Sequence, residues 1–82
     1  MSSGIIEIDV HGMNQFQAKT MIDAALKRAN RGTYMIRIIH GYHSGTALRD
    51  MIRSRYRSHP KIIRIELGMN PGVTELVLRT LI

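Results

Sequence analysis

The stretch Ile38-Ile39-His40-Gly41-Tyr42-His43-Ser44-Gly45-Thr46-Ala47-Leu48-Arg49 decides how this chain is organised. An apolar run ends in a histidine, a short loop with two glycines follows, and a helical pattern then begins. Such a helix start offers unpaired backbone N–H groups and the positive end of the helix dipole, which suit a phosphate. The alternative is an ordinary α/β turn that binds nothing. We expect a phosphate-binding loop made by Gly41, His43, Ser44, Gly45, Thr46 and Arg49.

The residues before this stretch predict a strand, a helix and a second strand. Alternating apolar residues indicate a strand over residues 4–10, and apolar residues at helical spacing indicate a helix over residues 14–29. Asn14 is a good N-cap, and Gln17 stands three residues later, as in a capping box. The second strand covers residues 34–39. This order implies a parallel pair of strands joined by a right-handed crossover.

Three candidate functional side chains stand at the ends of these two strands. Asp9 and His11 end the first strand, and His40 ends the second. Because the carboxyl ends of parallel strands lie at one edge of the sheet, we expect the three to come together there.

The second half of the chain completes a small two-layer fold. A helix is predicted over residues 46–58, followed by strands over 62–67 and 74–81 that are expected to pair antiparallel across a short loop. Charged residues on one face of the strands indicate a sheet covered on one side only. The predicted fold class is α/β (α+β), a two-layer sandwich of order β-α-β-α-β-β. Its four-stranded sheet is mixed, with both helices on one face.

Charge is the most informative property of the composition. Twelve Lys and Arg against six Asp and Glu give a net charge of +6, and nine of the twelve are arginine, which favours bidentate phosphate contacts. Arg49, Arg53 and Arg57 follow i, i+4, i+8 spacing and form a basic ridge on the second helix. Nucleic acid is therefore the leading partner, and an ordinary solvated surface is the alternative.

Other features exclude whole classes of protein. The 82 residues predict a single domain over 5–82 behind a short polar lead, residues 1–4. The chain has no cysteine, which excludes disulfide scaffolds and thiolate metal sites and fits a cytoplasmic location. No apolar run is long enough for a transmembrane helix, so no membrane association is expected.

Three motifs in order resemble those of the small MutS-related (Smr) domain family over nearly the whole chain. The first is Ile8-Asp9-Val10-His11-Gly12, and the second is the His-Gly stretch from His40 to Arg49. The third is the glycine-containing loop and strand from Gly68 to Val77. The chain departs from the pattern at His43, where the family has a second glycine, and in the third loop, which holds Asn70 and Pro71.

The resemblance implies a fold similar to the C-terminal domain of translation initiation factor three. It also implies nucleic-acid binding with DNA-nicking or RNA endonuclease activity, in a domain often fused to larger proteins. Some members of the family bind nucleic acid without cutting it.

Phosphodiester cleavage needs a base, an acid and positive charge near the phosphate. We expect His11 and His40 to act as acid and base, with Asp9 as an orienting carboxylate or metal ligand. On RNA the 2′-OH attacks without a metal, whereas on DNA water attacks and Mg²⁺ or Mn²⁺ held by Asp9 and His11 becomes more useful. Structural alternatives stay open: His11 as a turn cap, His40 as a buried histidine bonded to backbone, and Asp9 as the partner of Arg37.

Two functions therefore compete. The first is an Smr-type endonuclease acting on DNA or RNA through Asp9, His11 and His40. The second is a non-catalytic module that binds structured nucleic acid or a protein partner.

Overall fold

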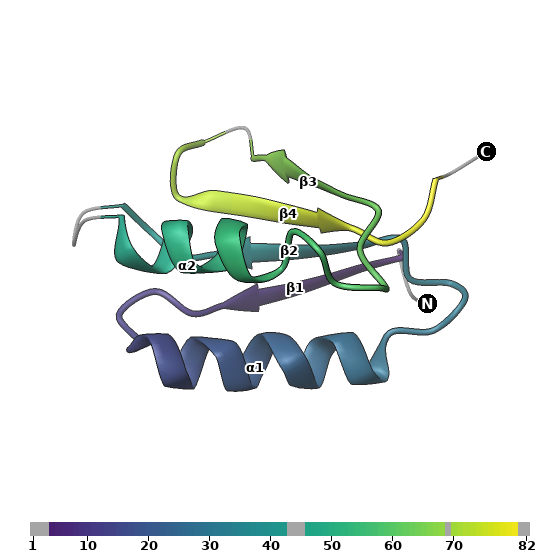
Figure 1. Ribbon diagram of the computed structural model, residues 1–82, viewed down its shortest axis with the longest axis horizontal. Coiled ribbons are helices and arrows are strands. Elements are labelled where there is room, and N and C mark those ends of the chain that lie inside the picture. The colour runs from purple at the N-terminus through teal and green to yellow at the C-terminus, as the bar shows by residue number, and fades with distance from the viewer. Residues whose placement is uncertain (1–3, 43–45, 69, 81–82) are drawn as a thin grey trace.

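The computed structural model describes residues 4–42, 46–68 and 70–80. Four strands and two helices follow one another as β1 (Ile5–Asp9), α1 (Gln15–Arg28), β2 (Met35–Ile39), α2 (Ala47–Arg55), β3 (Arg64–Leu67) and β4 (Val73–Val77). The strands form one sheet in the order β1-β2-β4-β3, and both helices lie on the same side of it (Figure 1).

The strand pairing confirms the predicted mixed sheet. β1 and β2 run parallel, with Asp9 opposite Ile39, and β3 and β4 run antiparallel. The sequence did not reveal that β4 would insert between β2 and β3, pairing antiparallel with β2. This insertion brings the start of β4 to the carboxyl ends of β1 and β2.

Several elements are shorter than predicted. Helix α2 ends at Arg55 rather than at residue 58, because Tyr56 is its C-cap and turns its ring into the core, where its hydroxyl donates to Asp23 at 2.7 Å. β3 begins at Arg64 rather than at residue 62, and β4 ends at Val77 rather than at residue 81. Helix α1 has its predicted capping box, in which Asn14 accepts from the Gln17 backbone and Gln17 accepts from Asn14.

The core lies between the helices and one face of the sheet. Alternate strand residues point into it, among them Ile8, Ile36, Ile38 and Leu76, with Ile22 of α1 and Ile52 of α2 packing against them. This alternation also places Thr74 and His40 on the helix side, where both are buried.

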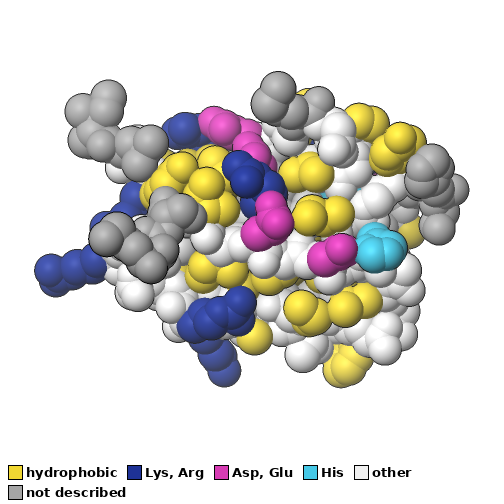
Figure 2. Space-filling model, turned by 180° about the vertical axis from the view of Figure 1, so that it is seen from behind, with side chains coloured by type: hydrophobic (Ala, Val, Ile, Leu, Met, Phe, Trp, Pro, Cys, Tyr) yellow, Lys and Arg dark blue, Asp and Glu magenta, His cyan; other side chains and the backbone are white. Residues whose placement is uncertain are grey.

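The opposite face of the sheet has no helix over it in the described part of the chain. A row of acidic side chains crosses this face with a basic side chain among them and apolar residues on either side (Figure 2). The acidic residues that strand register assigns to it are Glu7, Asp9, Glu66 and Glu75. Within the described residues, neither helix is long and apolar enough to cross a membrane.

Candidate nucleic-acid site

Three loops meet at the carboxyl edge of β1 and β2. The backbone N–H groups of His40 and Gly41 both donate to the carbonyl of Gly72, at 2.9 and 3.0 Å. Gly41 has a positive φ of 74°, and a Cβ built there would lie 3.5 Å from the Cβ of His11. The predicted meeting of the two strand ends therefore occurs, and the loop before β4 joins it.

A cavity of about 480 Å³ opens at this edge. Both candidate histidines line it, together with Gly41, Tyr42 and residues from the starts of the two helices. His11 and His40, 29 positions apart in the sequence, thus share one cavity, but their surroundings differ.

Asp9 and His11 form a close pair, of which His11 lines this cavity. The Asp9 Oδ1 atom accepts from the His11 backbone N–H at 3.1 Å and from its Nδ1 at 2.5 Å. The hydrogen bond from the His11 side chain holds the pKa of Asp9 below its usual value, so this carboxylate stays ionised. With Nδ1 donating to Asp9, the lone pair of the ring is on Nε2, and the His11 side chain is 70% exposed.

His40 is buried and has both ring nitrogens engaged. Its Nδ1 lies 2.7 Å from the Gly41 carbonyl, and its Nε2 lies 2.9 Å from the Thr74 hydroxyl. A carbonyl can only accept, so Nδ1 carries the proton and the Thr74 hydroxyl donates to Nε2. Burial lowers the pKa of His40, which favours the neutral ring. The structure thus has the buried, backbone-bonded arrangement of His40, and the role of His40 as acid or base stays a prediction.

Thr74 connects His40 to the basic ridge. The Nε of Arg53 donates to the Thr74 hydroxyl at 3.3 Å, so one hydroxyl links Arg53 with the imidazole of His40. Neither Thr74 nor Gly72 was among the predicted site residues. The alternation of residues along β4 could have indicated Thr74, because it puts this threonine on the same buried face as Leu76.

The start of α2 carries two of the predicted phosphate ligands, Thr46 and Arg49. Thr46 is the N-cap, but its hydroxyl donates to the Asp50 carboxylate at 2.9 Å instead of capping the helix. Arg49 also pairs with Asp50, at 3.2 Å. A phosphate at this helix start would therefore compete with Asp50 for Arg49. The other predicted loop residues, His43, Ser44 and Gly45, lie outside the described residues.

Asp9 and His11 were the two side chains expected to hold a metal ion. Among the described residues, no group of three His, Cys, Asp or Glu side chains is placed to hold a metal ion. Asp9 and His11 are hydrogen-bonded to each other. His40 does not add a third metal ligand to this pair, because its two ring nitrogens are bonded to Gly41 and Thr74.

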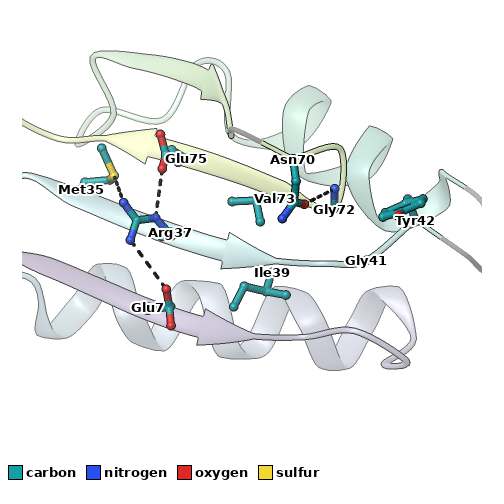
Figure 3. A pocket seen from close by; sticks show the side chains of 10 residues that line it. All are labelled: Glu7, Met35, Arg37, Ile39, Gly41, Tyr42, Asn70, Gly72, Val73 and Glu75. Carbon is teal, nitrogen blue, oxygen red and sulfur yellow. Dashed lines mark hydrogen bonds and ion pairs between the residues drawn. The ribbon is translucent and has the colours of Figure 1, made fainter.

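A larger hollow, of about 770 Å³, lies on the open face of the sheet and has a different character. Arg37 sits there between two carboxylates, with its Nε 3.0 Å from Glu75 and its Nη1 3.7 Å from Glu7 (Figure 3). The alternative pairing of Arg37 with Asp9 is therefore wrong. Because the charges in this hollow are already paired and acidic groups outnumber Arg37, it does not suit a polyanion.

Comparisons with known proteins support the family and the fold of the chain. A family model described as Smr domain matches residues 8–73. A solved structure, the Smr domain of Thermus thermophilus MutS2, superposes with a TM-score of 0.81 at 29% sequence identity. The match covers 92% of this chain and 99% of that one. No curated protein matches the sequence.

Proposed function

We propose that this chain, which belongs to the Smr domain family, binds nucleic acid and cleaves a phosphodiester bond beside Asp9 and His11. The observation that carries the proposal is the Asp9–His11 pair, with Oδ1 and Nδ1 2.5 Å apart, in which His11 lines a cavity that also borders the start of α2. A carboxylate that holds one imidazole nitrogen protonated directs the lone pair of the other nitrogen toward substrate. Net charge and a helix start then supply attraction for the phosphate.

The residues have separate roles in this proposal. His11 Nε2 removes a proton from the attacking oxygen, which is the 2′-OH on RNA or water on DNA. As this oxygen bonds to phosphorus, the P–O bond to the leaving oxygen breaks, and the leaving oxygen takes a proton from water. Asp9 orients the ring and stabilises the imidazolium that forms. Arg49 and the start of α2 hold the phosphate and balance the charge that builds on it. His40 positions the loop after β2 by donating a hydrogen bond to the Gly41 carbonyl.

The test is a cleavage assay on labelled single-stranded RNA, duplex DNA and branched DNA. It is run with Mg²⁺, with Mn²⁺ and with chelator, so that the metal requirement is measured directly. We expect His11→Ala to lower the cleavage rate by about 10²- to 10⁴-fold, the usual contribution of a general base. His59→Ala is the matched control, since His59 lies beyond α2 at the opposite end of the helix from the site.

The outcomes separate two functions. Cleavage by His11→Ala at the parental rate would refute the role of this pair. Salt-dependent binding with no cleavage of any substrate by the parent would instead support the second candidate, a non-catalytic nucleic-acid module. The hydrogen bonds of His40 favour that candidate. Both ring nitrogens of His40 are bonded to protein groups, so within the described site His11 is the exposed imidazole that can reach a substrate.

A further inference from the structure

The edge strand β3 is incompletely covered by the helical layer. Helix α1 packs on β1 and against α2, and α2 packs on β4, whereas β3 lies beyond β4 at the edge of the sheet (Figure 1). Apolar residues at this edge are consequently exposed, with Ile63 at 53% and Leu67 at 68%. Exposed apolar residues gathered beside a groove are characteristic of a binding surface rather than of random surface composition.

A groove of about 380 Å³ runs between this edge and α2. Arginines and aliphatic side chains line it together: Arg53, Arg57, Arg64, Ile63, Ile65 and Leu67. Arg53 is bonded to Thr74 through Nε, and this bond does not use its two Nη groups, which form the fork that binds phosphate. Arg64 is paired with Glu66, so Arg53 and Arg57 are the principal cations of the groove.

The distribution of charge favours binding of a polyanion at the α2–β3 groove over binding at the open face of the sheet. Four of the six acidic residues, Glu7, Asp9, Glu66 and Glu75, belong to the open face of the sheet by strand register. The chain nevertheless carries +6, so the positive excess lies elsewhere. The basic ridge is only partly helical: Arg49 and Arg53 lie on α2, whereas Arg57 follows its C-terminal end. Arg53 and Arg57 line the groove, and Arg49 lies in the first turn of α2.

We infer that the α2–β3 groove binds unpaired nucleotides that flank the cleaved bond, with phosphates on Arg53 and Arg57 and bases against Ile63 and Leu67. The inference rests on the proposed function, because it requires that the chain binds nucleic acid. In a duplex the faces of the bases are covered by their neighbours, so aliphatic side chains gain contact only from a base that is unstacked. The groove therefore selects single-stranded flanks over fully paired ones.

The experiment measures binding by fluorescence anisotropy in the presence of chelator. The probes are an oligothymidylate, the same strand with abasic sites, and a duplex of equal length. We expect Leu67→Ser to weaken binding of the oligothymidylate roughly fivefold and to leave binding of the abasic strand unchanged. We expect Arg57→Gln to weaken binding of both single strands and to reduce the slope of log affinity against log salt by about 0.7.

Arg31→Gln is the matched control for charge, because Arg31 is exposed in the loop between α1 and β2 and does not line the groove. It should leave the preference for single strands over the duplex intact. Thermal unfolding checks that each variant is folded, and Ile63→Thr replaces Leu67→Ser if that variant is not.

Different experimental outcomes would refute the groove and the proposed function. If the parent binds neither these probes nor a single-stranded RNA of equal length in a salt-dependent way, the proposed function itself is wrong. If the parent binds oligothymidylate and both Leu67→Ser and Arg57→Gln bind it equally well, only the groove is wrong. Tighter binding of the duplex than of the single strand by the parent also overturns the groove.

Discussion

Replacing Thr74 with valine tests the buried link between His40 and Arg53. Thr74 is fully buried, and valine has nearly the same shape, so the substitution removes the hydroxyl without opening a cavity. His40 Nε2 then loses its donor, and the ring cannot change tautomer because Nδ1 must still donate to the Gly41 carbonyl. Arg53 Nε loses its acceptor as well, but this side chain is only half-buried and water can replace the bond.

The expected loss of stability comes mainly from the histidine. Leaving one buried polar atom without a partner costs about 1–3 kcal/mol. Each kcal/mol lowers the Tm of a domain of this size by about 4–8 °C. Urea and thermal unfolding of the parent and Thr74→Val measure the effect. Thr74→Ser keeps the hydroxyl but deletes a buried methyl group, worth about 0.8 kcal/mol, so NMR of this variant should still show the His40 proton on Nδ1.

Thr20→Val is the control for the substitution itself. Thr20 is exposed on α1 and its hydroxyl donates to the Phe16 carbonyl of the same helix, so its loss should change stability by less than about 0.5 kcal/mol. Equal stability of Thr74→Val and the parent would show that the hydroxyl does not satisfy His40. An NMR spectrum of the parent with the His40 proton on Nε2 would refute the assigned direction of both bonds.

Two further predictions concern pH and capping. Because burial lowers the pKa of His40, the unfolded chain binds a proton more readily than the folded one, so this residue makes stability fall as pH drops through about 6.5. Urea unfolding at a series of pH values, with an NMR titration of His40, measures this, and a midpoint at or above 6.5 would contradict it. Asn14→Ala should lower the unfolding free energy by about 1 kcal/mol through loss of the capping box, whereas Asn14→Ser should retain most of the stability.

Much of the fold follows from local patterns in the chain. The alternation of apolar residues in β1 and β2, the helical spacing between them and the Asn14–Gln17 box all depend on neighbours a few residues apart. Two strands joined by a helix run parallel through a right-handed crossover, so their carboxyl ends lie at one edge of the sheet. The meeting of His11 and His40 at this edge was therefore also predictable. The ends of α2 and β4 were not, because burial of Tyr56 and the short pairing of β4 depend on contacts with distant residues.

The sequence alone determined the element types, the family motifs, the basic charge and the edge of the sheet where the candidate site lies. Only the tertiary structure decided how the two histidines differ. The insertion of β4 between β2 and β3 places Thr74 against His40, which engages and buries that ring, while His11 stays exposed and paired with Asp9. The same insertion puts β3 at an edge that the two helices do not fully cover. These outcomes depend on strand order, a long-range choice that no local periodicity encodes.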